Sequence, residues 1–231
     1  MKKLVAALVR ELGTYHKILE AGVGTGRFAE PLQTAGFDVF GIDISSKMTD
    51  KAKKKGVKQL LLADARFLPF KPNSFDAAIS VHVLHLISEW KKALQEICRV
   101  TRYTMFSVGE ANRDPVQEAY NRLLKNSGHE RHHPGKSEQQ LNEIFCPARK
   151  VFVTSYEINA NETLMKLEKR TSSSQWTIPE DVNSKAVGEL KREFADKTFR
   201  QELYLLIWQM EPLKAYCNTA NIAENADAIY K

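Results

Sequence analysis

The chain has 231 residues, of which 43% are hydrophobic and 27% charged, and its formal net charge is +6 at pH 7. This composition excludes a disordered chain and predicts a soluble, cytoplasmic protein with a sizeable core. The start, MKKLVAALV, has the charge and hydrophobicity of a signal peptide, but Arg10 and Glu11 interrupt its apolar run and no cleavage site follows. Leu4, Leu8 and Leu12 predict an amphipathic helix instead. No other segment is apolar for long enough to cross a membrane, so no membrane partner is expected.

A short apolar strand is predicted at residues 17–21, and it runs directly into three glycines at alternate positions. These are Gly22, Gly24 and Gly26. Glycine here lets a strand turn sharply into a helix and leaves backbone amides open to a ligand. A second predicted strand, at 37–42, ends next to Asp43, where a carboxylate can accept both hydroxyls of a ribose. The spacing therefore indicates a site for an adenosine-type ligand.

The glycine rhythm distinguishes this turn from a dinucleotide site, which needs glycine or alanine at the position of Arg27. The pattern is E-x-G-x-G-x-G, starting at Glu20. It resembles the first motif of the class I S-adenosylmethionine-dependent methyltransferases. Two later segments extend the resemblance: LLLADARFLPF, with Asp64 and Ala65, and NSFDAAISVHVLHLI, which is similar to the fourth strand and following turn of the small-molecule, ubiquinone- and menaquinone-biosynthesis-like branch. Together they span about residues 17 to 100.

The strand and helix pattern predicts an α/β fold. Strands are expected near residues 17–21, 37–42, 58–63, 75–80, 103–110, 150–158 and 203–210, with helices between them. The resemblance implies a doubly wound, seven-stranded, mostly parallel Rossmann-like sheet of order 3-2-1-4-5-7-6, in which the seventh strand is antiparallel. We expect one domain over 1–231, with a cofactor-binding core at 17–110. Substrate-side helical excursions are expected at 111–200, after strands 5 and 6.

The resemblance also implies S-adenosylmethionine as cofactor and assigns its contacts. Asp43 would hold the ribose, and Asp64 with Ala65 the adenine ring and its amine. The fourth strand would pass beneath the methionine part. The full set of expected cofactor contacts is Glu20, Gly22, Gly24, Gly26, Asp43, Ile44, Met48, Asp64, Ala65 and Val81.

No catalytic residue is assigned by the sequence. His82 and His85 lie just past the fourth strand, where the methyl group should emerge, and either could remove a proton from a nucleophile. For His85 the alternative is a role in packing or capping. Trp176 and Tyr15 are candidates for the substrate pocket, the latter because relatives carry a longer aromatic-containing segment before the first strand. Burial for packing is the alternative for Trp176.

Metal binding is not predicted. His129, His132 and His133 lie in GHERHHPG, which we interpret as a solvated loop because no carboxylate or cysteine is placed to complete a metal site. The three cysteines are far apart in sequence and form no C-x-x-C pair, so neither a disulfide framework nor a zinc site is indicated. They are Cys98, Cys146 and Cys217.

The predicted function is transfer of a methyl group from S-adenosylmethionine to a small-molecule acceptor by in-line displacement. The family's N/D-P-P-Y/F signature for amino groups of bases is absent, since the equivalent place reads SVHVLHLI. Two alternatives remain open. The positive charge, concentrated in Lys51, Lys53, Lys54, Lys55 and Lys58, keeps methylation of tRNA or rRNA as the second reading. The third is a cofactor-binding subunit without catalysis. The acceptor atom and the oligomeric state are left open.

Overall fold

A computed structural model describes residues 1–111, 114–131 and 133–229, except for the side chains of Ser173 and of residues 220–229. Contacts divide the chain into two compact units. Unit 1 consists of Met1–Gly109, Pro134–Val153 and Tyr204–Lys231, and unit 2 of Glu110–His133 and Thr154–Leu203. Each unit has its own buried apolar cluster. The single domain of 1–231, with its core at 17–110 and excursions at 111–200, stays a prediction.

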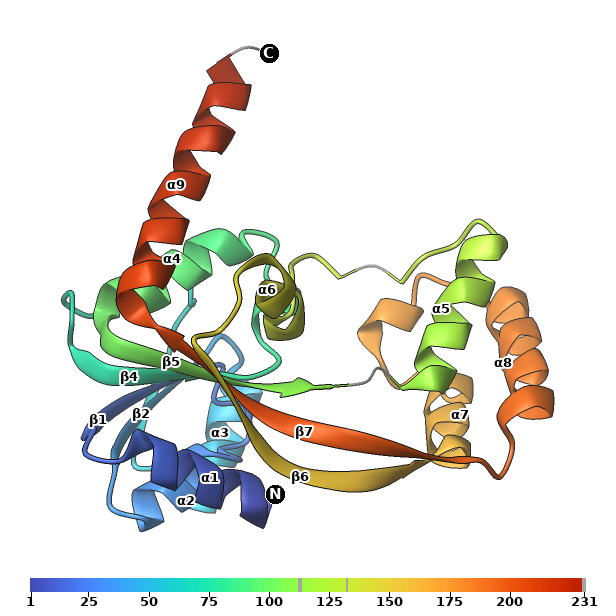
Figure 1. Cartoon of the computed structure of the whole chain (residues 1–231), viewed down its shortest axis with the longest axis horizontal. Coiled ribbons are helices and arrows are strands. Elements are labelled where there is room, and N and C mark those ends of the chain that lie inside the picture. Colours follow the sequence, from blue (N-terminus) through green and yellow to red (C-terminus); the bar gives the residue numbers. More distant parts are fainter. Residues whose placement is uncertain (112–113, 132, 230–231) are drawn as a thin grey trace. The chain divides into compact units, whose positions relative to one another are not determined.

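Seven strands form one mixed sheet in the order β3-β2-β1-β4-β5-β7-β6, with β7 antiparallel (Figure 1). The neighbouring pairs from β3 to β5 are parallel. The strands are β1 (Lys17–Ala21), β2 (Asp38–Asp43), β3 (Gln59–Leu62), β4 (Phe75–Ser80), β5 (Thr101–Glu110), β6 (Arg149–Asn159) and β7 (Thr198–Gln209). The predicted fold class and strand order are confirmed.

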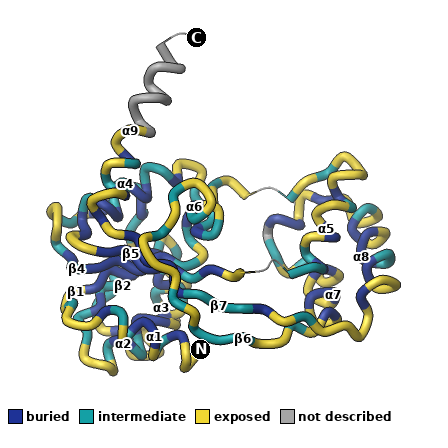
Figure 2. Tube along the Cα trace, in the orientation of Figure 1, coloured by how far each residue is buried: buried dark blue, intermediate teal, exposed yellow. Residues whose placement is uncertain are grey.

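The central strands are buried on both faces, as Figure 2 shows for β1, β2, β4 and β5. Their near-continuous apolar runs are typical of parallel strands covered by helices, and such runs are easy to locate in a sequence. The first four predicted strands accordingly lie within about one residue of the observed ones. The seventh was predicted five residues too late, because its first half alternates between exposed and partly buried positions and includes Arg200 and Glu202.

Helices cover both faces of the sheet in unit 1. Figure 1 shows α1, α2 and α3 on one face, while α4, α6 and α9 contribute to the apolar cluster that packs on the other. Their bounds are α1 (Lys2–Leu12), α2 (Ala29–Thr34), α3 (Ser46–Lys55), α4 (Trp90–Val100), α6 (Glu138–Ile144) and α9 (Met210–Ile229), with a 3₁₀ turn, η1 (Leu84–Leu86). The predicted amphipathic start is confirmed, since Leu4, Leu8 and Leu12 are all buried on α1. No helix in the described ranges combines the length and apolarity needed to span a membrane.

Two cysteines that are distant in sequence meet in this cluster. Cys98 on α4 and Cys217 on α9 are both buried and reduced, and their thiols are hydrogen-bonded to each other. This hydrogen bond, together with burial, raises the pKa of Cys98 well above its ordinary value. The contact joins α9 to α4.

Unit 2 packs three helices around an apolar core: α5 (Pro115–Asn126), α7 (Ala160–Glu168) and α8 (Glu180–Phe194), with a short 3₁₀ turn, η2 (Ser173–Gln175). A buried hydrogen bond runs from Tyr120 Oη on α5 to Asn183 Oδ1 on α8. The loop before α8 is fastened by Arg170, whose Nη2 donates to the carbonyls of Gln175, Trp176 and Ile178. These polar contacts fix how the three helices pack.

Candidate functional site

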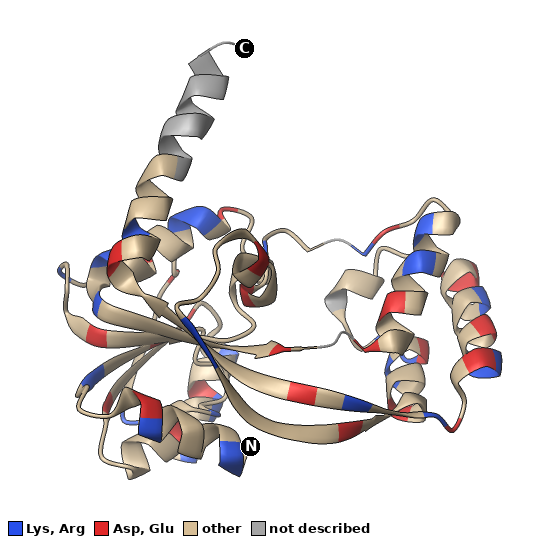
Figure 3. Cartoon of the chain, in the orientation of Figure 1, with Lys and Arg blue, Asp and Glu red and all other residues tan. Residues whose placement is uncertain are grey.

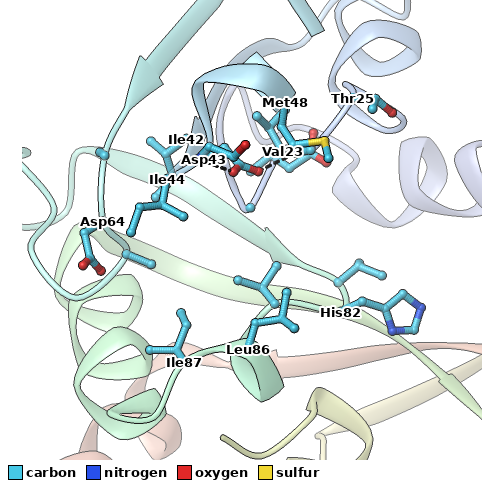
Figure 4. Close-up of a pocket in the computed structure, with 18 of the residues that line it drawn as sticks. Val23, Thr25, Ile42, Asp43, Ile44, Met48, Asp64, His82, Leu86 and Ile87 are labelled. Carbon is cyan, nitrogen blue, oxygen red and sulfur yellow. Dashed lines mark hydrogen bonds between the residues drawn. The ribbon is translucent and has the colours of Figure 1, made fainter. Parts of the chain in front are cut away.

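A cavity of about 730 Å³ opens in unit 1 at the carboxyl ends of β1, β2 and β4 (Figure 4). Strand order reverses between β1 and β4, and ligands of doubly wound sheets bind at such a point. The lining residues are Glu20, Gly22, Val23, Gly24, Thr25, Arg27, Phe28, Ile42, Asp43, Ile44, Ser45, Met48, Ala63, Asp64, Ala65, Arg66, Val81, His82, Val83, Leu86, Ile87 and Ser88. Nine of the ten predicted cofactor contacts are in this set; Gly26 is not.

The glycine turn after β1 has two kinds of glycine, although all three have positive φ angles of 71°, 54° and 73°. A Cβ on Gly22 would lie 2.3 Å from Val83 Cγ2, so its absence lets the loop after β4 approach. Gly24 has no neighbour within 4 Å of a Cβ and faces open space. Gly26 instead makes room for Val57, whose Cγ2 would lie 2.6 Å from a Cβ. Its glycine requirement therefore comes from packing.

Asp43, the last residue of β2, ties the glycine turn to the start of α3. Its Oδ2 accepts the backbone N–H of Gly24 and its Oδ1 that of Ser45, both at 2.9 Å. A carboxylate has about four lone-pair sites, so each oxygen can accept a further donor. The side chain faces the cavity, where those remaining sites are open to hydroxyl groups of a ligand (Figure 4).

Glu20 on β1 is the most buried acid of the site, with only 4% of its surface exposed. Burial penalises the charged form and raises the pKa of Glu20 from 4.5 to about 8. Within the described part of the chain, no group donates a hydrogen bond to its Oε2. An orphaned carboxyl oxygen is unfavourable in a folded protein, and a ligand with cationic N–H donors would supply what it lacks.

Asp64 is already held by a residue that the sequence analysis missed. Arg66 donates to both Asp64 oxygens, with an Nη2 to Oδ2 distance of 2.7 Å, and its Nη1 donates to Glu89 at 2.6 Å. These hydrogen bonds lower the pKa of Asp64 and keep its carboxylate ionised. An arginine two positions after the acid was the only sequence signal for this pair.

Apolar side chains form opposite walls of the cavity. Figure 4 shows Ile44 and Met48 on one side and Leu86 and Ile87 on the other. Ile44 and Leu86 are 71% and 58% exposed, so each presents apolar surface that a ligand can cover. Two exposed apolar surfaces facing each other across a cavity suit a flat ring inserted between them.

The loop after β4 separates the two histidine candidates. His82 lines the cavity and has a φ of 60°, a strained conformation for a residue with a side chain (Figure 4). His85 is not a lining residue, and its carbonyl accepts the N–H of Gly135 at 3.0 Å. The geometry therefore favours His82 as the residue near a bound reactant.

A buried glutamate outside the predicted set shapes this loop. Glu138, the first residue of α6, is 2% exposed, and its Oε1 accepts from Ser80 Oγ at 2.9 Å and from the backbone N–H groups of Val83 and Leu84 at 3.0 and 3.3 Å. Gly135 packs so closely that a Cβ would lie 2.1 Å from the Leu84 carbonyl oxygen. Ser137 and Gln140 form a capping box at the start of α6, and nothing in the sequence links this helix to a loop more than fifty residues earlier.

Neither predicted substrate-pocket residue is among the residues that line this cavity. Tyr15 precedes β1, donates or accepts a 2.9 Å hydrogen bond with Thr104 Oγ1 and stacks on Tyr103, at the amino ends of the strands rather than the carboxyl ends. Its ring is therefore used for packing, and it does not line the cavity. Trp176 belongs to unit 2, where it is 68% exposed and donates from Nε1 to the Arg170 carbonyl. Its predicted role stays a prediction.

The histidine-rich loop is also in unit 2. His133 is exposed, and His129 Nδ1 lies 2.8 Å from the Ser127 carbonyl oxygen. His132 is outside the described residues. Among those described, no three His, Cys, Asp or Glu side chains come together as a metal site would require. The absence of a metal stays a prediction.

A comparison with known proteins finds a family model that covers all the residues lining the cavity. Residues 19–104 match the family model described as "Methyltransferase domain". Over 87 residues the chain is 39% identical to the demethylmenaquinone methyltransferase of Renibacterium salmoninarum, covering 37% of each chain. It is 40% identical over 84 residues to an uncharacterized protein of Methanocaldococcus jannaschii, covering 36% of this chain and 38% of that one. The matched segment is thus well under half of these curated relatives.

Solved structures match over a longer range at lower identity. The YcgJ protein of Bacillus subtilis has a TM-score of 0.58 and 20% identity, covering 90% of this chain and 99% of that one. A Thermotoga maritima protein described as a S-adenosylmethionine-dependent methyltransferase, possible histamine N-methyltransferase, has a TM-score of 0.54 and 18% identity, covering 91% and 89%. At these identities the structures support the fold. The family match and the motif order identify the segment 19–104 as class I S-adenosylmethionine-dependent methyltransferase sequence.

Proposed function

We propose that this chain binds S-adenosylmethionine in the unit 1 cavity and transfers its methyl group to a small-molecule acceptor. The observation that carries the proposal is the convergence of Glu20, Asp43 and Asp64, from three neighbouring strand ends, on one cavity with apolar walls. Its volume of about 730 Å³ is in the range of small-molecule sites. The acids match the polar groups of the cofactor, and the walls match its adenine.

Different residues contact different parts of the cofactor. Asp43 accepts the ribose hydroxyls with its remaining lone pairs, and the adenine inserts between Ile44 and Leu86. Glu20 accepts the ammonium group of the methionine part, which gives its orphaned Oε2 a donor and favours its ionised form. The backbone of Gly24 lies open beside them, so that no side chain limits the approach of the cofactor.

The cofactor supplies a methyl group that its sulfonium already activates, so the protein's task is placement. The walls exclude water, and the loop after β4 orients the acceptor for in-line attack. His82 is the proton acceptor for a nucleophile that must lose a proton, because it is the histidine that lines the cavity. His85, whose neighbouring backbone is engaged by Gly135, supports the loop instead.

A small-molecule acceptor is supported by the relatives named demethylmenaquinone methyltransferase, from Renibacterium salmoninarum and from Paenarthrobacter aurescens, each 39% identical over 87 residues. Their names specify a quinone precursor. The lysines of α3 are exposed and solvated, as a polar helix face would be, and no aromatic residues interleave with them to stack on bases.

Calorimetric titration with S-adenosylmethionine and its demethylated product tests the cofactor site. We expect micromolar binding to the wild type and a loss of about 100-fold in Asp43→Ala, because two charge-assisted hydrogen bonds to the ribose disappear. Asp38→Ala is the matched control, since Asp38 begins the same strand at its opposite end and bonds to Gln59. A folded wild-type protein that binds neither compound would overturn the proposal.

Acceptor screening then tests the transfer step. Radiolabelled methyl transfer to demethylated quinones, other small metabolites and tRNA should give product with a small molecule. Product with tRNA alone would favour the RNA reading. Tight cofactor binding without any product across the panel would favour a non-catalytic, cofactor-binding subunit.

A further inference from the structure

Unit 2 contains a second, smaller cavity of about 260 Å³ beside the C-terminal half of α5. Its lining residues are all polar: Asn121, Lys125, Glu130, Arg131 and His133. Asn121 and Lys125 are four residues apart and so lie on the same face of the helix. Figure 3 shows the basic residues of α5 in this half of the helix. The cavity is large enough for a phosphate or carboxylate group.

Three neutral groups hold the guanidinium of Arg131 in this cavity. Nε donates to Ser174 Oγ at 3.0 Å, Nη1 to Gln117 Oε1 at 2.5 Å and Nη2 to Ser172 Oγ at 3.4 Å. The two serine hydroxyls are themselves hydrogen-bonded at 2.9 Å. A planar guanidinium held in this way loses little conformational freedom when its remaining N–H groups bind a ligand.

The positive charge of Arg131 is not neutralised within the described residues. Its three partners are all uncharged, so two of its five N–H donors stay available. Burial lowers the pKa of Arg131, since partial removal from water disfavours its charged form. Among the same residues, neither Lys125 nor Glu130 forms an ion pair with it or with each other.

We propose that this cavity binds the oxyanion of a small molecule, a phosphate or carboxylate group, through the two remaining N–H groups of Arg131 and the Lys125 ammonium. Arginine with two open donors matches the two oxygens of such a group, and the nearby lysine adds a mobile positive charge. Asn121 and His133 supply further polar groups at the wall. The site lies outside the methyltransferase motifs, and the inference does not depend on methyl transfer.

Glu130 allows the charge of the ligand to be tested, because its carboxylate lies in the same cavity and repels an anion. An oxyanion site therefore predicts opposite effects for two neighbouring exposed residues. Removing the Lys125 charge weakens binding, and removing the Glu130 charge strengthens it. A site for a cation or an ammonium group predicts the reverse order.

Calorimetric titration of the full chain with inorganic phosphate and with acetate, at ionic strength fixed with chloride, tests this site. We expect saturable binding of one of the two probes, weakened about fivefold in Lys125→Gln and strengthened about fivefold in Glu130→Gln. Arg131→Lys should weaken binding by about tenfold, since lysine keeps the positive charge but lacks the planar guanidinium and its paired N–H donors. Lys185→Gln, at an exposed lysine of α8 that does not line the cavity, is the matched control.

Tighter binding of phosphate assigns a phosphorylated ligand, and tighter binding of acetate a carboxylated one. Lys125 and Glu130 are exposed, so their variants should fold even if Arg131→Lys weakens the contacts with Ser172 and Ser174. The inference fails if the wild type binds neither probe beyond chloride, or if Lys125→Gln and Lys185→Gln behave alike. Cofactor titration in the same samples separates this result from any failure in unit 1.

Discussion

Glu20 in unit 1 and the Tyr120–Asn183 pair in unit 2 are buried polar groups with different hydrogen bonding. In unit 1, the buried Glu20 carboxyl keeps an oxygen without a hydrogen-bond donor in the described structure, at the wall of a cavity. In unit 2, Tyr120 donates to Asn183, and Gln175 Nε2 donates to the Leu167 carbonyl at 3.1 Å. An unsatisfied buried group is unfavourable unless a ligand completes it, whereas a satisfied network stabilises the fold alone. The Glu20 carboxyl thus lacks a donor that a ligand can supply, whereas the Tyr120–Asn183 hydrogen bond is complete within the helices of unit 2.

Glycine substitutions should show the largest difference between the units. Gly22→Ala places a Cβ 2.3 Å from Val83 Cγ2 at a φ of 71°. We expect a loss of about 2–4 kcal/mol in the free energy of unfolding and a cofactor affinity reduced by about 100-fold. Gly128→Ala in unit 2 has a similar φ of 75° but no neighbour within 4 Å. It should cost only about 1 kcal/mol and leave affinity unchanged.

Urea unfolding and calorimetry on both variants measure these effects. Equal losses of cofactor affinity in Gly22→Ala and Gly128→Ala would show that the close approach to Val83 is not what shapes the cavity.

Glu138→Ala should have the next largest effect. It removes the acceptor of Ser80 Oγ at the end of β4 and of two backbone N–H groups on the loop after it, and we expect a loss of about 3 kcal/mol in the free energy of unfolding. Faster amide hydrogen exchange is expected at Val83 and Leu84, because their N–H groups donate hydrogen bonds to Glu138 in the wild type. Glu138→Gln keeps an acceptor oxygen and should restore most of the protection. Unchanged exchange at both amides in the alanine variant would exclude this role for Glu138.

The sequence predicted those parts of unit 1 that depend on short stretches of backbone. The first four strands, the glycine turn and the position of Asp43 follow from apolar runs and from glycines only a few residues apart. Arg66 and Glu138 were missed because their roles depend on side-chain contacts, and Glu138 meets Val83 across 55 residues of sequence. Tyr15 packs on Tyr103 at the amino ends of the strands, because an aromatic residue near the first strand can pack at either end of the sheet.

Unit 2 offered no comparable signal. Its core is formed by helices that the sequence located only as excursions, and the serines beside Arg131 gave no indication of a guanidinium among them. Contacts between separate helices depend on how the helices pack, which a single sequence does not display.

The pH dependence of cofactor binding provides a smaller but more specific test of unit 1. Because the folded pKa of Glu20 is raised to about 8, its carboxyl is protonated at neutral pH and must ionise to accept a cationic ligand. Affinity for S-adenosylmethionine should therefore rise with pH, by up to about tenfold per unit, and level off above about pH 8. Glu20→Gln should remove this dependence. A wild-type affinity for S-adenosylmethionine that does not change with pH would contradict this role of Glu20.

The stability of the free protein should change in the opposite direction. The folded state holds the Glu20 proton up to about pH 8, whereas the unfolded chain releases it near 4.5. The unfolding free energy therefore falls as pH rises between these values, by at most about 1.4 kcal/mol per unit for this group. Chemical denaturation of the wild type and Glu20→Gln across this range isolates the contribution.

Tyr120→Phe in unit 2 should have the smallest effect. The variant keeps the buried ring but leaves Asn183 Oδ1 without the donor that it has from Tyr120, which should cost about 1–2 kcal/mol. Since neither Tyr120 nor Asn183 lines the unit 1 cavity, cofactor affinity should stay within about twofold of the wild type. The double variant with Asn183→Ala should be less destabilised than the sum of the two, because both remove one hydrogen bond. A clear loss of cofactor affinity in Tyr120→Phe would mean that the buried network of unit 2 also serves binding in unit 1, and the contrast between the units would no longer hold.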